Sequence, residues 1–278
     1  MKFDLHTHSH FSDGSDSPYM IVKKAKELGI TVALTDHNSV EGLDEFVFAG
    51  KEYGVDVVPG VEFSTDYGEK EIHIIALFID EEHYDTVRQL TAFADTLKEE
   101  SNVILAANLN KNGYEVDYEE IRETTNDGRV NRVHFAKYLV DKKYVSSINE
   151  AFETLISKKS GNYIPPKRLD VFDTIGYIRM MNAVPIIAHA PLNLTIDELT
   201  GFLPKAKDHG LIGIETCYSL YNDDTSLKMK LLAKKFDLLE SSGSDYHGTS
   251  KPDISLGMMN MEGISPCDFD KLKNSISK

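Results

Sequence analysis

The chain has 278 residues, with 30 Lys and Arg against 45 Asp and Glu, which gives a formal net charge of −15. This length accommodates one large domain, or one domain with a sizeable insertion. The acidic balance disfavours a protein that follows a long nucleic acid, because such binding depends on Lys and Arg at the phosphates. It does not exclude a small phosphorylated ligand, since bound cations can reverse the charge locally.

Cysteine usage and hydropathy disfavour further classes of protein. The two cysteines, Cys217 and Cys267, form no CxxC motif, which argues against a disulfide framework and against a thiolate zinc site. The N-terminus carries no apolar signal-like segment, and no apolar run approaches the length of a membrane span. We therefore predict a cytoplasmic protein that does not bind a membrane.

Short apolar runs rich in Val and Ile alternate with helical segments along most of the chain. The first helix is predicted from Ser17, which can cap it, through Pro18 in its first turn, to Gly29 at its C-terminal end. Further helices are predicted over residues 41–54, 170–181 and 226–236. Seven segments are predicted strands: residues 2–8, 30–37, 55–64, 71–79, 183–190, 210–219 and 238–248. The alternation predicts an α/β fold with a parallel sheet, closed or nearly closed into a barrel.

Residues 81–166 interrupt this alternation, because they are polar and helix-prone and lack a convincing strand. One or two amphipathic helices are predicted up to Gly113, and two more over residues 129–144 and 147–160. We predict a barrel domain of residues 1–80 and 167–278 and a helical insertion of residues 81–166. The insertion is either a lid or a plain structural elaboration.

The N-terminal segment MKFDLHTHSHFSDGS contains His6, His8, His10 and Asp13. Other residues separate these histidines, unlike those of a purification tag. Side chains two residues apart on a strand point the same way, so His6 and His8 can present two nitrogens to one divalent ion. His10 is predicted to be a bystander.

Nearly every predicted strand carries His, Asp or Glu at or near its C-terminal end. The later members of this set are Asp36, His37, Glu62, His73, His189, Glu215, Asp245 and His247. Each has a structural explanation when taken alone, such as a buried core histidine or a helix cap. Together they indicate chemistry at the rim where the strands of such a barrel end.

The ligand set contains imidazoles and carboxylates without thiolates, which suits Zn²⁺, Mn²⁺ and Fe²⁺. So many ligands imply two or three divalent ions, with a carboxylate bridging two of them. Ions about 3.5–4 Å apart can hold a hydroxide between them and bind a phosphoryl oxygen. The sequence therefore predicts a metal centre suited to phosphate esters.

Five motifs occur in order along the chain: DLHTHSHFSDG, TDHNSVEG, GVEFS, IAHA and SGSDYHG. They resemble the ordered motifs of the PHP superfamily, named for polymerase and histidinol phosphatase, from the first residues to about Gly248. The resemblance implies a distorted (β/α)7 barrel, with a helical insertion and a trinuclear metal centre at its C-terminal rim. The motif IAHA departs from the usual AHP, and TCYSLYND after Glu215 lacks the histidine that nucleotide-acting relatives often have.

The resemblance also implies a ligand set. The first ion is expected to bind His6, His8, Glu62 and Asp245. Glu62 is expected to bridge to a second ion completed by His73 and His134, and a third ion to bind Asp13, His37, His189 and His247. Asp36 is implied to orient a ligand imidazole, and Glu215 to lie just outside the ligands or in the pocket wall.

The segment NRVHFAKYLV resembles a helix of small stand-alone PHP phosphoesterases that act on nucleotides. In those enzymes the helix carries a metal-ligating histidine preceded by an arginine, which correspond here to His134 and Arg132. Arg132 and Lys167, in NYIPPKRLD, are predicted phosphate contacts, with surface charge as the alternative for each.

We predict a metal-dependent phosphoesterase in which a metal-bridging hydroxide attacks phosphorus in line. Arg132 would stabilise the phosphoryl charge, and His189 or His247 would protonate the leaving oxygen. The expected substrate is a small phosphomonoester, preferably a nucleotide such as AMP or a 3′,5′-bisphosphonucleotide; short RNA ends stay open and long ones are disfavoured. The alternatives are a histidinol-phosphate phosphatase, a phosphotyrosine phosphatase and a non-catalytic metal-binding PHP module, and a less favoured one is an amidohydrolase. The metal and the oligomeric state are not predicted.

Overall fold

The computed structural model describes residues 3–125, 130–258 and 267–276. It contains two compact units, Met1–Thr91 together with Leu169–Lys278, and Ala92–Arg168. The first boundary lies within helix α3 (Tyr84–Lys111), so these limits differ slightly from the predicted domain boundaries at residues 80 and 166. The biological division into domains stays a prediction.

The first unit is built on one sheet that closes almost completely on itself. Its strands, in spatial order, are β1 (Phe3–Asp4), β2 (Thr31–Leu34), β3 (Val57–Tyr67), β4 (Lys70–Leu77), β6 (Val184–Ile187), β7 (Gly213–Tyr218) and β8 (Leu239–Gly243), with the short β5 (Leu169–Asp170) paired to β3. Backbone hydrogen bonds from Leu5 to Ser242 (3.0 Å) and from Asp245 to His6 (2.9 Å) join the two ends of this order. The predicted α/β barrel of seven strands is confirmed.

The expectation of an all-parallel sheet is wrong at one strand. β4 pairs antiparallel with both β3 and β6, whereas the other neighbouring pairs are parallel. The cause is the connection, because β3 and β4 are separated by only Gly68 and Glu69, which leaves no room for a crossover helix. Gly68 takes a left-handed φ of 61° in this hairpin turn.

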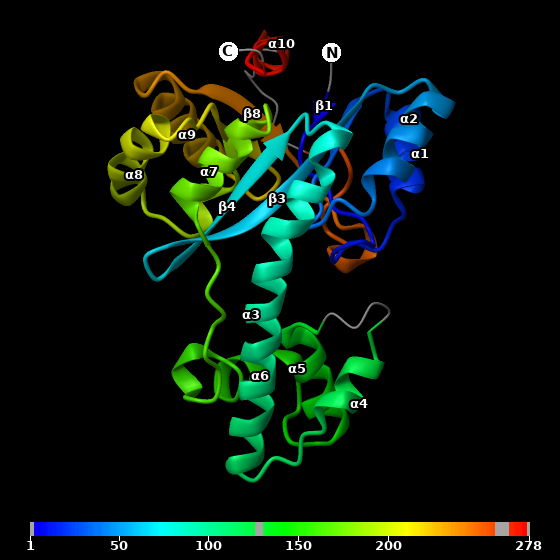
Figure 1. Ribbon diagram of the computed structural model, residues 1–278, viewed down its shortest axis with the longest axis vertical. Helices are drawn as coiled ribbons and strands as arrows, with labels where there is room; N and C mark the ends of the chain where they lie inside the picture. The colour runs from blue at the N-terminus through cyan, green and yellow to red at the C-terminus, as the bar shows by residue number, and fades with distance from the viewer. Residues whose placement is uncertain (1–2, 126–129, 259–266, 277–278) are drawn as a thin grey trace. The chain divides into compact units, whose positions relative to one another are not determined.

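Helices of the first unit pack against the outside of the sheet. They are α1 (Pro18–Leu28), α2 (Leu43–Tyr53), α7 (Val171–Met180), α8 (Ile196–Asp208) and α9 (Asp223–Lys235), whereas α10 (Cys267–Asn274) covers one end of the barrel. In Figure 1, α1 and α2 lie on one side of the sheet and α7, α8 and α9 on the other. The predicted ends of the first helix are confirmed, since the Ser17 side chain accepts from the backbone of Met20 and Gly29 takes a left-handed φ of 64°.

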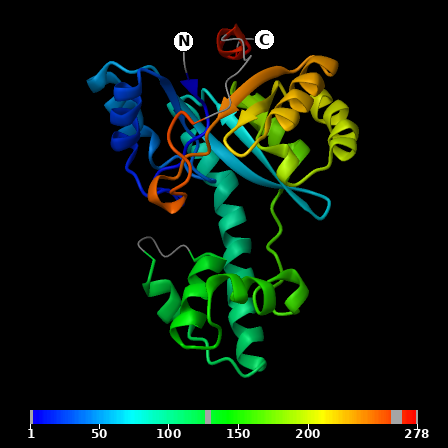
Figure 2. The ribbon, with the colours of Figure 1, turned by 180° about the vertical axis from the view of Figure 1, so that it is seen from behind.

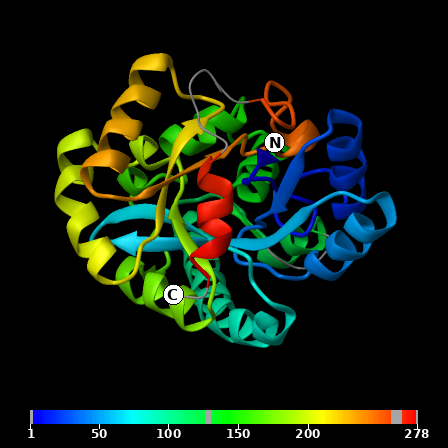
Figure 3. The same cartoon turned by 90° about the horizontal axis from the view of Figure 1, so that it is seen from above.

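Apolar side chains fill the barrel interior toward the N-terminal ends of its parallel strands. This interior cluster consists of Phe3, Leu5, Ala33, Val58, Ile75, Leu77, Val184, Ile186, Ala188, Phe269 and Leu272. Figure 3 looks onto this end of the barrel, with α10 lying across it. The rings of Phe269 and Phe3 stack there with centroids 5.4 Å apart. Burial of these side chains stabilises the end of the barrel away from the histidines.

The second unit is helical. It contains the C-terminal part of α3, then α4 (Tyr118–Glu123), α5 (Arg132–Asp141) and α6 (Ile148–Thr154), which are visible in Figure 2. Its own core includes Leu105, Leu109, Phe135, Leu139 and Ile156. The helical character predicted for this region is confirmed, although α4 was not expected. Within the described parts of the chain, no helix has the length and apolar character that crossing a bilayer requires.

Candidate metal centre

The imidazoles and carboxylates predicted from the strand ends gather at one rim of the barrel, where the parallel strands end. His6 and His8 follow β1, Glu62 lies in β3, and His73 lies in the first half of β4. Because β4 is antiparallel, this half of β4 lies beside the second half of β3, with His73 in register with Ser64. His189 follows β6, and Asp245 and His247 follow β8. The reversed strand therefore delivers its histidine to the same rim as the others.

Glu62 is the centre of this arrangement, and it is completely buried. One of its oxygens, Oε2, lies 3.3 Å from Nε2 of His6, 3.3 Å from Nε2 of His8 and 2.9 Å from Nδ1 of His37. The other, Oε1, lies 2.9 Å from Nδ1 of His73 and 3.0 Å from Nε2 of His189. One carboxylate thus faces five imidazoles, an arrangement suited to a bridging ligand.

Asp245 and Asp13 supply the other two carboxylates. Oδ1 of Asp245 lies 3.2 Å from Nε2 of His8 and 3.6 Å from Nε2 of His6. Oδ1 of Asp13 lies 3.0 Å from Nε2 of His247, while its Oδ2 lies 3.8 Å from Nε2 of His37. The backbone of Asp245 takes a positive φ of 58°, a conformation that costs energy for an aspartate and is typical of functional sites.

Within the described residues, four overlapping groups of ligand atoms lie close enough to hold a metal ion. They are His8, Asp13, His37 and His247; His6, Glu62 and His189; His6, His8 and Asp245; and His37, Glu62 and His73. The ligand atoms of each group lie within 4.8 Å of one another. This division differs from the one that the resemblance implied, because His189 groups with His6 and Glu62 rather than with Asp13.

The protonation pattern of the imidazoles fits bound cations. Nδ1 of His6 lies 3.2 Å from Oε1 of Glu215, and Nδ1 of His247 lies 2.8 Å from the carbonyl of Asp245. If these Nδ1 atoms donate, Nε2 of each ring keeps a lone pair that points into the centre. Nε2 of His6 and of His247 and Oε2 of Glu62 are buried atoms without a hydrogen-bond partner among the described residues, which is costly unless a ligand satisfies them. The donor set therefore fits divalent ions.

The electrostatics show how the charges at this centre balance when protons take the place of metal. Burial alone would raise the pKa of Glu62, but the neighbouring imidazoles, His37 first, hold this pKa well below its usual range. Burial alone would lower the pKa values of His8 and His73, but the carboxylates beside them raise both to about 9. Since a ligand imidazole must be neutral, metal binding here displaces protons.

Comparison with known proteins places this centre in a family. The sequence profile of the PHP domain matches residues 4–163, and the ordered histidine and carboxylate motifs stand at the rim just described. The chain belongs to the PHP family. It is a metal-dependent phosphoesterase of that family, the class of enzyme predicted from its motifs.

Relatives of this PHP protein cover nearly its whole length. A 5′-3′ exoribonuclease of Haemophilus influenzae is 34% identical over 249 residues, which make up 88% of this chain and 90% of the relative. A 3′,5′-nucleoside bisphosphate phosphatase of Chromobacterium violaceum is 27% identical over 259 residues, which make up 91% and 90%. A solved structure titled as an amidohydrolase from Chromobacterium violaceum, with bound sulfate and no metal, has a TM-score of 0.83 at 25% identity and covers 99% of this chain and 97% of its own.

Asp36 has partners other than the predicted imidazole. Its carboxylate accepts hydrogen bonds from the backbone and hydroxyl of Ser9 (2.7 and 2.6 Å) and from the hydroxyl of Ser12 (2.6 Å). Asp36 and His37 are consecutive, so their side chains diverge, and Asp36 turns toward the loop that leads to Asp13. Asp36 of this PHP chain thus fixes the loop that leads to Asp13. His10 is exposed, as expected of a bystander.

Among the described residues, Glu71, Tyr218 and Lys251 contact the centre and were not predicted. Oε1 of Glu71 lies 3.2 Å from Nε2 of His73, and the hydroxyl of Tyr218 and the ammonium of Lys251 both bind Oδ2 of Asp245. Glu71 could have been found, because it stands two residues before His73 on the same face of a strand. Tyr218 and Lys251 carry no such signal, since their side chains meet Asp245 only in the folded chain.

The three remaining site residues of the prediction, Arg132, His134 and Lys167, lie in the helical unit. The guanidinium of Arg132 lies over the ring of Tyr163, 4.4 Å from its centroid. Nδ1 of His134 accepts a hydrogen bond from the backbone of Asn131 (3.0 Å), as part of a capping box at the start of α5. A neutral imidazole that accepts at Nδ1 carries its proton at Nε2, so metal binding through Nε2 would cost this contact. The predicted roles of all three residues stay predictions.

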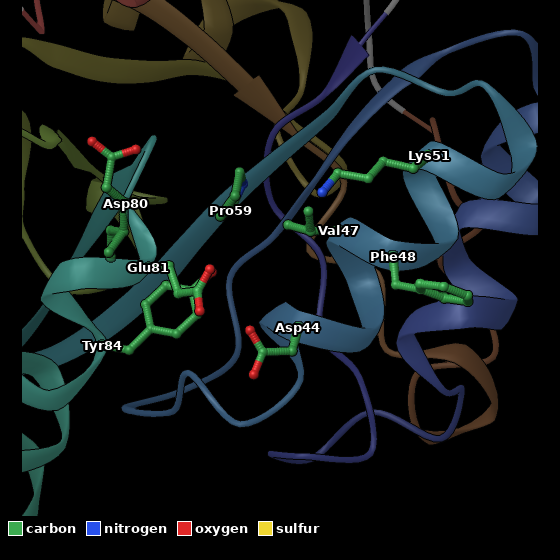
Figure 4. Close-up of a pocket in the computed structure, with 9 residues that line it drawn as sticks. Asp44, Val47, Phe48, Lys51, Pro59, Asp80, Glu81 and Tyr84 are labelled. Atoms are coloured by element: carbon green, nitrogen blue, oxygen red, sulfur yellow. The ribbon is translucent and has the colours of Figure 1, made fainter.

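A separate cavity of about 310 Å³ lies elsewhere in the barrel unit (Figure 4). Its lining includes Asp44 and Lys51 of α2, Pro59 near the start of β3, and Asp80 and Tyr84 after β4. Pro59 precedes Glu62 by three residues in β3, so the cavity lies toward the first half of this strand. None of the metal-ligand candidates lines this cavity, so it is distinct from the centre.

Proposed function

We propose that this PHP phosphoesterase hydrolyses a phosphate ester of a nucleotide, with AMP or a 3′,5′-bisphosphonucleotide as the expected substrate. The observation that carries the proposal is the buried Glu62 carboxylate facing five imidazoles, with Asp13 and Asp245 beside them. A mononucleotide is supported by the bisphosphate phosphatase of Chromobacterium violaceum, which resembles this chain over most of its length.

The proposal assigns two or three divalent ions, of Mn, Fe or Zn, to the four ligand groups, with Glu62 as the bridge. When bound, such ions supply a hydroxide at neutral pH and offset charge on the phosphoryl oxygens. The chain's own ligands are proposed to be His6, His8, Asp13, His37, Glu62, His73, His189, Asp245 and His247. The roles predicted for Arg132, Lys167 and His134 belong to the same proposal and are supported by the resemblance of their segments to nucleotide-acting PHP enzymes.

The leaving oxygen needs a proton, and two histidines were predicted to donate it. Nδ1 of His247 is engaged with the carbonyl of Asp245, and its Nε2 faces Asp13. His189 has its Nε2 beside Glu62, and its buried Nδ1 has no hydrogen-bond partner in the part of the chain that the structure describes. If Nε2 of His189 binds metal, Nδ1 is the nitrogen left to hold the proton for the leaving oxygen, and we favour His189 over His247 because Nδ1 of His247 is already engaged with a carbonyl.

A second candidate activity is removal of nucleotides from the 5′ end of short RNA. The observation in its favour is the 34% identity to the exoribonuclease of Haemophilus influenzae. The net charge of −15 favours short over long RNA, because a long strand needs Lys and Arg along its path. Both candidates use attack of hydroxide on phosphorus, but AMP and the bisphosphonucleotide are phosphomonoesters, whereas the linkage cleaved in RNA is a phosphodiester whose phosphorus also carries the rest of the strand.

Turnover assays of the Mn²⁺-loaded protein test the proposal. The panel comprises AMP, 3′,5′-bisphosphoadenosine, a 5′-phosphorylated oligoribonucleotide a few residues long, histidinol phosphate and phosphotyrosine. We expect the highest kcat/KM on a nucleotide or on the short RNA, and no turnover after substitution Glu62→Gln. Preference for histidinol phosphate or phosphotyrosine would overturn the nucleotide assignment. Lack of turnover on all five would favour a non-catalytic metal-binding module.

A further inference from the structure

The two oxygens of the Asp245 carboxylate face different surroundings. Oδ1 is turned toward the imidazoles of His8 and His6, at 3.2 and 3.6 Å. Oδ2 accepts a hydrogen bond from the hydroxyl of Tyr218 at 2.8 Å and lies 2.8 Å from Nζ of Lys251. One oxygen is therefore available to a metal ion, and the other holds a cation at the edge of the centre.

The contact with Asp245 holds the ammonium group of Lys251 in place but occupies only part of its hydrogen-bonding capacity. Its side chain is 40% exposed, whereas that of Asp245 is 5% exposed. An ammonium has three N–H donors, and Asp245 is its one hydrogen-bond partner within the described residues. The backbone around Lys251 is fixed, since its carbonyl accepts from Ile254 (3.0 Å) and the nearby Thr249 donates to the hydroxyl of Ser15 (2.8 Å). Free donors thus remain at a defined place.

A fixed cation beside a cation-binding centre needs an explanation. Lys251 repels divalent ions and draws electron density away from the oxygen pair of Asp245, so its charge weakens metal binding. Tyr218 alone could orient Asp245 without that penalty, because its hydroxyl binds the same oxygen. The charge of Lys251 becomes favourable when an anion enters the site, since an ammonium at a phosphate oxygen forms a strong charge-assisted hydrogen bond.

We propose that Lys251 contacts the substrate and binds an oxygen of the phosphoryl group at the metal centre. This inference deepens the proposed function and rests on it for the identity of the ester. It adds a phosphate contact from the loop after β8 to the contacts predicted at Arg132 and Lys167.

The test compares Lys251→Met, which removes the charge but keeps the length, with Lys251→Arg, which keeps the charge. Lys228→Met is the matched control, because Lys228 pairs with Asp224 on the surface of α9 (2.5 Å) and is 51% exposed. For each Mn²⁺-loaded protein, calorimetry measures binding of orthophosphate, elemental analysis measures bound metal, and turnover gives KM and kcat.

We expect Lys251→Met to weaken orthophosphate binding and to raise KM by about 10- to 100-fold, as loss of one hydrogen bond to a charged group does. The metal content of Lys251→Met should equal that of the wild type. The orthophosphate affinity and KM of Lys251→Arg and of Lys228→Met should stay within a few fold of the wild-type values. Unchanged orthophosphate binding in a folded, metal-loaded Lys251→Met would overturn the inference. The inference would also be overturned if Lys251→Met lost metal but bound orthophosphate normally once metal was restored. That result would make Lys251 a positioning residue for Asp245.

The orthophosphate measurement separates this inference from the proposed function. If the wild type binds orthophosphate through Lys251 but hydrolyses no nucleotide, the nucleotide assignment fails and the inference holds. If the metal-loaded wild type binds no orthophosphate, the inference fails even when a nucleotide is turned over. If Lys251→Met does not fold, as judged by thermal unfolding, Lys251→Gln replaces it under the same criteria.

Discussion

The two ends of the barrel interior contain opposite kinds of side chain. Toward the N-terminal ends of the parallel strands the interior is apolar, with Leu5, Ile75 and Leu272 buried together. Toward the other end it contains imidazoles and carboxylates that are equally buried, such as His6 and Glu62. Single segments contribute to both ends, since Leu5 directly precedes His6 after β1, and Ile75 follows His73 by two residues within β4.

The apolar end of the interior stabilises the barrel, whereas the polar end holds the residues of the candidate metal centre. Apolar burial contributes roughly 25 cal/mol per Å² and requires no partner of particular geometry. Buried charges cost free energy unless they are paired, and removing one partner leaves the others uncompensated. Substitutions at the apolar end should therefore lower stability and leave metal binding intact, whereas substitutions at the polar end should weaken metal binding and also disturb the balance of buried charges.

The largest effect is expected for Glu62→Gln. This change removes the negative charge that five imidazoles face, so metal binding should fail in the ligand groups that include Glu62. Because bound ions supply several kcal/mol of transition-state stabilisation, we expect kcat/KM to fall by about 10³-fold or more. Glu41→Gln is the control, since Glu41 is an exposed glutamate paired with Arg88 (2.9 Å). If Glu62→Gln kept its full metal content and activity, the assignment of metal binding to the polar end of the barrel would be wrong.

The matching test at the apolar end is Leu272→Ala. Leu272 is completely buried in the interior cluster, and truncation of such a leucine lowers the free energy of unfolding by about 2–5 kcal/mol. Denaturant titration measures this loss, and Lys273→Ala, at an exposed position of the same helix, should change stability little. Elemental analysis should find the same metal content as in the wild type. Loss of metal from folded Leu272→Ala would show that the two ends are not independent.

A smaller effect is expected for Glu215→Gln. Oε1 of Glu215 lies 3.2 Å from Nδ1 of His6, and Oε2 accepts from the backbone of His189 at 2.8 Å. A glutamine has one acceptor oxygen, so one of these two contacts is lost. Loss of a group that orients a metal ligand lowers metal affinity by about 10- to 100-fold. Competition with a chelator measures this change, with Glu240→Gln on β8 as the control.

The smallest effect is a pH dependence of the metal-free protein. The pKa values of His8 and His73 are raised to about 9, against 6.5 ordinarily, by carboxylates that outweigh burial. Their charged forms therefore stabilise the fold fully below pH 6.5, and this contribution is lost as the pH rises through about 9. The Tm of metal-free protein should fall over that interval.

Saturating Mn²⁺ should cancel or reverse this fall, because neutral imidazoles bind the metal more strongly as the pH rises. Thermal unfolding across the interval, with and without Mn²⁺, checks both statements. A Tm of metal-free protein that is flat or rises from pH 6.5 to 9 would contradict the pairing described for His8 and His73.

Much of the barrel and of its rim could be predicted, because the signals are local. Alternating strands and helices predicted the barrel, and pairs such as His6 and His8 share a strand face. The direction of β4 could have been predicted only by reading the segment around Gly68 as a hairpin turn. Tyr218 and Lys251 could not be predicted, since both meet Asp245 from separate segments of the folded chain. The direction of the Asp36 side chain likewise depends on the loop that contains Ser9 and Ser12.

The central claim is that the polar rim is a multinuclear metal centre bridged by Glu62. The most direct test is the number of divalent ions per chain, measured by elemental analysis after loading with Mn²⁺ and removal of free metal. We predict two or three ions per chain in the wild type and fewer than two in Glu62→Gln. One ion or none in the wild type, or an unchanged number in Glu62→Gln, would contradict the claim.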